Sequence, residues 1–105
     1  MYILDDVAYA GEVTPLLKIA KIRALSDYKL FVVFNNNTMG IFDFKPFLEE
    51  IAFEPLKEIS KFQGVYLEYG VPVWENGEID IAPEFIIKSE YFQTLTASEV
   101  SRLSV

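Results

Sequence analysis

The segment Tyr28–Phe34 constrains the fold most, because it has the pattern of a strand with apolar side chains on both faces. It reads Tyr-Lys-Leu-Phe-Val-Val-Phe. Successive side chains of a strand point to opposite faces, so Phe31 and Val33 share one face while the other large apolar residues share the other. Both faces of the sheet that contains this strand must therefore be shielded from water.

The flanking residues predict that this strand is the middle of an antiparallel meander. Charged and apolar residues alternate over 19–24, which is the period of a half-exposed strand. Three asparagines at 35–37 suit a tight hairpin turn, because Asn tolerates left-handed backbone angles. The segment 38–44 is then the returning strand.

The remaining segments predict short helices and further strands. Pro46 and Pro83 each fit the first position of a helix, where no backbone N–H is needed. Gly64 is placed to end a helix, and Asn76-Gly77 predicts a turn. We predict helices near 46–51, 55–62 and 83–89, strands near 65–69 and 72–75, a short strand at 78–81, and a capping box at 96–99.

Together these elements predict an α+β fold: an antiparallel, meander-based sheet of about five strands covered by short helices. The 105 residues fit one domain, with an N-terminal arm at 1–18, a core at 19–90 and a C-terminal tail at 91–105. Short helices can cover one face of such a sheet but hardly both. We therefore expect a homodimer to cover the second face, with the alternative that the two tails cover it within one chain.

Composition disfavours several kinds of chemistry. The chain has no cysteine and no histidine, which excludes disulfides, thiolate metal sites and histidine-activated nucleophiles built from this chain alone. We expect no catalytic residues, no cofactor and no metal site. A net charge of −7 disfavours nucleic acid and anionic membranes as partners. Without a signal-peptide pattern or a membrane-length apolar run, we expect a cytoplasmic protein.

Several short pieces between residues 19 and 90 occur in the order and spacing of a known family. They are Leu25–Leu30, Phe42–Phe44, Phe53–Leu56, Phe62, Trp74–Gly77 and Ile79–Glu84. On these pieces the chain resembles the bacterial domain-of-unknown-function family 2442. The resemblance implies a compact α+β domain, found alone or joined to a DNA-binding helix-turn-helix, that accompanies other small bacterial proteins. The chain departs from the family pattern at Glu75, where proline is common, and at Phe85-Ile86-Ile87.

Two charged clusters are candidate binding sites. Carboxylates in the first could hold a hard cation, although their spacing does not match a calcium-binding loop and turns are commonly polar for solvation. The second could bind an anion or nucleic acid, but the overall charge favours a solvated strand face. The acidic cluster is Glu75, Glu78, Asp80 and Glu84, and the basic cluster is Lys18, Lys21, Arg23 and Lys29.

Two single residues have both a functional and a structural interpretation. Trp74 could stack on a ligand, but a lone tryptophan in a strand more often packs in the core with its N–H bonded locally. Asp43 could be catalytic, but an aspartate just before Pro46 is typical of a helix entry.

We expect a small, non-enzymatic protein-interaction or regulatory accessory domain. Its partner is another protein or a second copy of the chain. The expected interaction surface comprises Phe31, Val33, Trp74, Tyr91 and Phe92. Two alternatives remain open: a ligand-binding module or enzyme that uses carboxylates, Lys61, Tyr66 or Tyr69, and a nucleic-acid-associated regulator.

Overall fold

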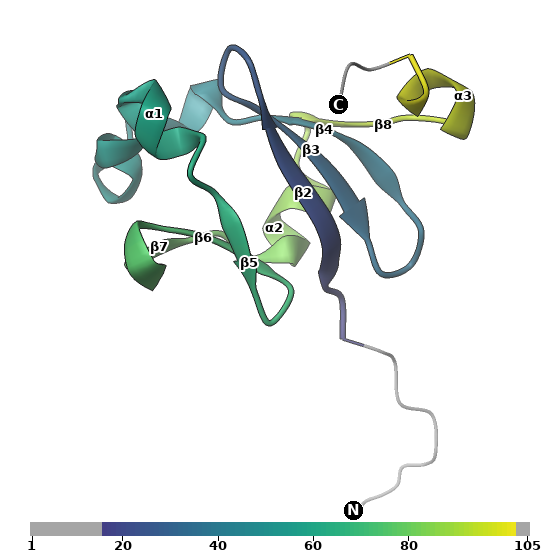
Figure 1. The fold of residues 1–105 in the computed structure, drawn as a ribbon, viewed down its shortest axis with the longest axis horizontal. Helices are drawn as coiled ribbons and strands as arrows, with labels where there is room; N and C mark the ends of the chain where they lie inside the picture. The colour runs from purple at the N-terminus through teal and green to yellow at the C-terminus, as the bar shows by residue number, and fades with distance from the viewer. Residues whose placement is uncertain (1–15, 103–105) are drawn as a thin grey trace, which may run out of the picture.

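Two small antiparallel sheets, rather than one, organise the chain (Figure 1). The computed structural model describes residues 16–102. The larger sheet has the strand order β2-β3-β4-β8 and the smaller one β5-β6-β7. Their bounds are β2 Ile19–Leu25, β3 Lys29–Phe34, β4 Met39–Asp43, β8 Phe92–Thr94, β5 Tyr66–Glu68, β6 Val71–Trp74 and β7 Ile79–Asp80.

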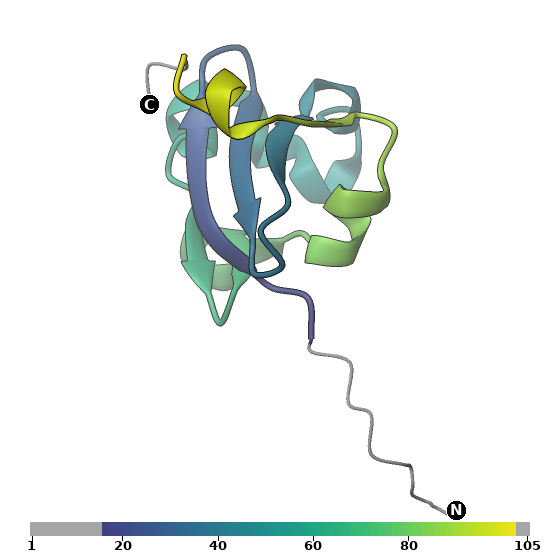
Figure 2. The ribbon, with the colours of Figure 1, turned by 90° about the vertical axis from the view of Figure 1, so that its right-hand side faces the viewer.

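The predicted α+β class and the meander are confirmed. Strands β2, β3 and β4 pair in sequence order, with β3 in the middle, and Figure 2 shows them side by side. The asparagine turn closes β3 onto β4: the Asn37 N–H donates to the Phe34 carbonyl at 3.0 Å, and Asn37 has a φ of 71°. That left-handed angle is the one the Asn-rich sequence predicted.

The prediction of a single sheet of about five strands is wrong. The main sheet has four strands, and the strands predicted near 65–69 and 72–75 form the separate smaller sheet with β7. Pro72 lies within β6 and has no N–H to donate, which limits the pairing of that strand. The two sheets meet where the Ile19 N–H donates to the Gly70 carbonyl at 2.8 Å.

The fourth strand of the main sheet, β8, comes from the segment predicted as a tail. Its residues Phe92 to Thr94 pair with Phe42 to Gly40 of β4. Gly40 allows this approach, because a Cβ at that position would lie 2.2 Å from the Gln93 carbonyl oxygen. A three-residue strand is too short to give a periodic signal in the sequence.

Short helices connect the strands, and part of their prediction needs correction. The helix predicted near 46–51 is a single 3-10 turn, and the one near 55–62 is split at Glu58, whose backbone is extended. Pro55 lies in the 3-10 portion, and its missing N–H disfavours continuation of a regular α-helix through this segment. The helices are η1 Lys45–Phe47, η2 Ile51–Lys57, α1 Ile59–Phe62, η3 Glu75–Gly77, α2 Pro83–Lys88 and α3 Ala97–Val100.

Two further local predictions are confirmed. Pro83 begins α2, and Thr96 and Glu99 form a reciprocal capping box at the start of α3. The Thr96 N–H donates to Glu99 Oε1 at 2.7 Å, and the Glu99 N–H donates to Thr96 Oγ1 at 3.2 Å. Within residues 16–102, no helix has the length and apolar character needed to cross a bilayer.

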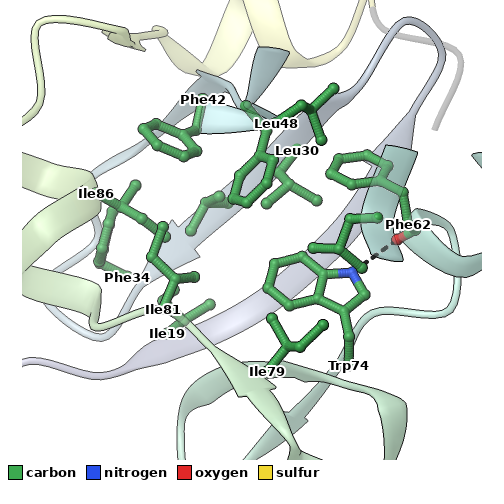
Figure 3. Close-up of a cluster of buried hydrophobic side chains, with 13 residues drawn as sticks. Ile19, Leu30, Phe34, Phe42, Leu48, Phe62, Trp74, Ile79, Ile81 and Ile86 are labelled. Atoms are coloured by element: carbon green, nitrogen blue, oxygen red, sulfur yellow. Dashed lines mark hydrogen bonds between the residues drawn. The ribbon is translucent and has the colours of Figure 1, made fainter. Parts of the chain in front are cut away.

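The hydrophobic core lies between the two sheets and the short helices (Figure 3). Trp74 at the end of β6 is completely buried, and its indole N–H donates to the Phe62 carbonyl of α1 at 2.8 Å. Its ring stacks on Phe62 and packs at an angle against Phe44. The interpretation of Trp74 as a core residue with a local hydrogen bond is confirmed.

The two faces of β3 have different cover. Leu30, Val32 and Phe34 belong to the core cluster, whereas Phe31 and Val33 point to the opposite face with Ile41 of β4 as a neighbour of Phe31. Figures 1 and 2 place α2 on the core side of the sheet and α3 on the opposite side. Only 8% of Phe31 is exposed. Phe31 is therefore largely shielded from water on the outer face within a single chain.

We predict that Gly40→Ala detaches β8 from the sheet. The added methyl group would overlap the Gln93 backbone, so the β4–β8 pairing must open, at a cost of about 1–3 kcal/mol. Hydrogen exchange should show lost protection at Leu95, whose N–H donates to the Met39 carbonyl, while β2–β3 amides stay protected. Gly64→Ala is the control, because a Cβ there would lie 3.3 Å from the Lys61 carbonyl oxygen, which needs a shift of only a few tenths of an ångström. Unchanged protection at Leu95 would contradict this account.

Candidate functional site

Three aromatic side chains from separate elements form a surface cluster, which we call the aromatic ridge: Phe47 of η1, Phe85 of α2, and Tyr91, which precedes β8. The ring centroid of Phe47 lies 5.3 Å from that of Phe85 and 5.6 Å from that of Tyr91, both edge to face. Beneath them, the buried Phe42 stacks on Phe47 at 5.6 Å. The ridge therefore stands directly on the core.

Hydrogen bonds at the end of β4 hold the start of η1 and Tyr91 in place. The Lys45 N–H donates to Asp43 Oδ1 at 3.0 Å where β4 turns into η1, which supports the helix-entry interpretation of Asp43. The Tyr91 N–H donates to Ser89 Oγ at 3.0 Å, and the Tyr91 carbonyl accepts from the Asp43 N–H at 3.0 Å. Both sides of the ridge are thereby tied to the end of β4.

Two hollows share Phe47 and Phe85 as lining residues, so they adjoin the aromatic ridge. The first has a volume of about 440 Å³ and also includes Tyr91. The second has a volume of about 260 Å³ and reaches Phe53 and Ile81. Phe85 is 46% exposed and Tyr91 is 41% exposed. Two large aromatic side chains thus remain exposed to water, although the backbone segments that carry them are packed against the rest of the domain.

Charged side chains surround the two hollows, and acids outnumber bases. Glu84, Glu90 and Lys88 line the first hollow, and Glu50 and Asp80 line the second. All five are exposed. The arrangement is an apolar centre with a polar, mainly acidic rim, which resembles the anatomy of a protein interface.

The described residues offer little for acid–base catalysis. Within residues 16–102, every ionisable side chain is exposed or half-buried, and no buried side-chain polar atom lacks a hydrogen-bond partner. Among these residues, no group of three or more carboxylates comes close enough together to hold a metal ion. The predicted acidic cluster does not form one site: Glu75 lies 3.9 Å from Lys61, whereas Asp80 and Glu84 line a hollow that also includes Lys18.

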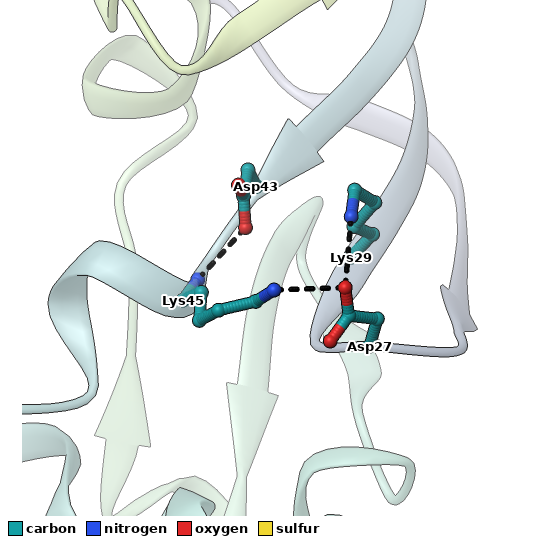
Figure 4. Close-up of polar contacts among 4 residues, drawn as sticks. All are labelled: Asp27, Lys29, Asp43 and Lys45. Atoms are coloured by element: carbon teal, nitrogen blue, oxygen red, sulfur yellow. Dashed lines mark hydrogen bonds and ion pairs between the residues drawn. The ribbon is translucent and has the colours of Figure 1, made fainter.

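The strongest polar cluster is structural (Figure 4). Asp27 Oδ2 accepts from Lys45 Nζ at 2.8 Å and from Lys29 Nζ at 3.3 Å, which links the β2–β3 turn to η1. The hydrogen bond from Lys45, with a second from Lys29, lowers the pKa of the Asp27 carboxyl, and the hydrogen bond to Asp27 raises the pKa of Lys45. Lys29, predicted as part of a basic cluster, is therefore engaged in an ion pair, while Lys21 and Arg23 line a separate hollow beside Phe31.

The residues expected to form the interaction surface do not lie together. Trp74 is buried in the core and adds no surface. Phe31 and Val33 are on the outer face of the main sheet, whereas Phe92 is half-buried and packs edge to face on the buried Phe34. Tyr91 is the member of the set that lies in the aromatic ridge.

Sequence reasoning missed Phe47 and Phe85 as members of a surface cluster. The predicted helices near 46–51 and 83–89 contain them, but neither was among the residues of the expected interaction surface. A signal was present at 85–87, because three consecutive large apolar residues in a short helix cannot all face inward. In α2, Ile86 is buried and Phe85 is exposed.

We predict that Asp27→Asn removes a pH-dependent increment of stability. A lowered pKa in the folded state means that ionised Asp27 stabilises the fold above about pH 4, and this contribution is lost as the pH falls through the lowered value. Urea titrations should therefore give the wild type a larger free energy of unfolding than the variant near neutral pH. The two free energies should converge as the solution is made acidic. Asn accepts the left-handed backbone at this position, where φ is 61°, so strain should not confound the comparison. A difference in the free energy of unfolding that persists in strong acid would contradict this role of Asp27.

Comparison with known proteins places the chain in one family. A family model described as "Protein of unknown function (DUF2442)" matches residues 19–91, which is most of the chain. Comparison with curated proteins and with solved structures gives no significant match. The match covers every strand from β2 to β7 and all three residues of the aromatic ridge, and it ends just before β8.

Proposed function

The chain belongs to the DUF2442 family, and from this premise we propose that it is a non-enzymatic protein-interaction domain. In this proposal it acts as a cytoplasmic accessory or regulatory domain, and its aromatic ridge binds a segment of another protein.

The observation that carries the proposal is the exposure of the ridge. Phe85 and Tyr91 keep 46% and 41% of their surface in water, although their backbones are held by hydrogen bonds and their rings pack on Phe47. Aromatic residues on a preorganised surface lose little entropy on binding and are enriched among the residues that dominate interface energies. The ridge has these properties.

The surroundings of the ridge favour a binding surface over an active site. Small-molecule and catalytic sites commonly converge several polar groups on an enclosed pocket, and they shift the pKa of buried groups. In residues 16–102 the ionisable side chains near the ridge are exposed. A shallow apolar surface with a charged rim instead supports contact with a protein segment.

Charge argues against a second copy of this chain as the occupant. A two-fold contact would place the same patch against itself, so the acidic rims of the two copies would face each other. Glu84 and Glu90 of one copy would then lie near those of the other. Like charges brought together at an interface oppose association. A different protein is therefore the occupant that we propose, and the homodimer is the competing outcome.

We predict that Phe85→Ser combined with Tyr91→Ser abolishes partner binding while leaving the fold intact. Immobilised wild-type protein should retain a stoichiometric partner from lysate of the organism that encodes it, and the double variant should not. Ile51→Ser is the matched control, because Ile51 is 91% exposed and lies outside both hollows. Circular dichroism checks that all variants fold.

Two results would contradict the proposal. The first is a partner retained equally by wild type and double variant. The second is a wild-type protein whose mass by light scattering is twice 12.0 kDa and whose double variant is monomeric, since the ridge would then bind a second copy.

A further inference from the structure

We infer that the aromatic ridge recognises a peptide segment that carries two large apolar side chains and adjacent lysine or arginine residues. This inference rests on the proposed function and adds the chemistry of the partner. It follows from the shape of the two hollows and from the charges around them.

The shape indicates two apolar anchors. The hollows of about 440 and 260 Å³ share Phe47 and Phe85, whose rings meet edge to face at 5.3 Å. A segment that crosses this pair can place one apolar side chain in each hollow. Tyr91 forms part of the wall for the first anchor, and Phe53 and Ile81 do so for the second. Anchors in adjoining hollows fix both position and direction of a bound segment.

The charge indicates basic neighbours for these anchors. Four carboxylates but one basic side chain line the two hollows. The carboxylates are those of Glu50, Asp80, Glu84 and Glu90, and the basic side chain is Lys88. None of these carboxylates is among the ion pairs found within residues 16–102. A lysine or arginine on the bound segment would meet exposed carboxylates on either side of the ridge. Such rim pairs add modest affinity but accelerate encounter and exclude acidic segments.

The basic cluster on the opposite face was the strongest competing candidate. Lys21 and Arg23 line a hollow beside Phe31 on the outer face of the main sheet. Phe31 itself is only 8% exposed, so that hollow offers little aromatic surface. The aromatic ridge has both exposed aromatic rings and carboxylates outside the ion pairs found within residues 16–102, so it is the better candidate for peptide binding.

The test is selection of peptides from a random displayed library on the full chain. We expect the retained peptides to contain two large apolar residues and to be enriched in lysine and arginine next to them. A synthetic peptide from this set should lose most of its binding to the variant with Phe85→Ser and Tyr91→Ser. Its affinity should also fall as salt is raised, because exposed ion pairs are screened.

A neutralised rim separates the charge from the apolar contacts. The combined variant Glu50→Gln, Asp80→Asn, Glu84→Gln and Glu90→Gln should bind the peptide roughly threefold to thirtyfold more weakly, the effect of a few exposed ion pairs. The control removes the same charge elsewhere, at four exposed acids outside both hollows. These are Glu54→Gln, Glu58→Gln, Glu68→Gln and Glu78→Gln.

The outcomes distinguish this inference from the proposed function. Peptides that require Phe85 and Tyr91 but show no basic enrichment, or that bind the two neutralised variants equally, would overturn the inference and leave the proposed function standing. A library that yields no peptides dependent on the ridge would overturn both.

Discussion

The hydrogen bond from the Trp74 indole to the Phe62 carbonyl is the contact on which the arrangement of the two sheets depends. The smaller sheet has only short strands, and such a sheet has little stability alone. Trp74 joins it to α1, and its ring packs against Phe44, the residue that follows β4 of the main sheet. Replacing Trp74 would leave the buried Phe62 carbonyl without its hydrogen-bond donor, which would destabilise the fold. One side chain thus fixes the position of three separate elements.

The same packing explains why an apolar surface can stay exposed without collapsing. Phe47 is held from below by Phe42, which lies in the centre of the main sheet. Phe85 is the outward neighbour of the buried Ile86. Burying the exposed Phe85 and the half-buried Phe47 completely would require η1 or α2 to rotate and expose core residues instead. The fold therefore stabilises its own exposed surface, and a partner can cover it without changing the core.

Much of the fold could be predicted from the sequence, and what could not has physical reasons. The alternation over β2, the apolar run of β3, the asparagine turn and the capping box at Thr96 are local signals, and they were sufficient to predict these elements. Strand β8 was missed because three residues show no period, and the division into two sheets was missed because it depends on tertiary contacts. The aromatic ridge joins η1 to α2 and Tyr91, which are far apart in sequence, so the sequence pattern could not reveal their proximity.

The pairing of β8 with β4 has a consequence for the order of events during translation. Domains generally fold as the chain emerges, from the N-terminal side first. Strand β4 leaves the ribosome long before β8, and until then its edge, including the Gly40 position that accepts the Gln93 backbone, has no neighbour there. Tyr91 is synthesised immediately before β8. We therefore expect a nascent chain to become competent for its partner only after this closing strand has emerged. Ribosome-bound chains stalled before residue 91 that already bind the partner would contradict this expectation.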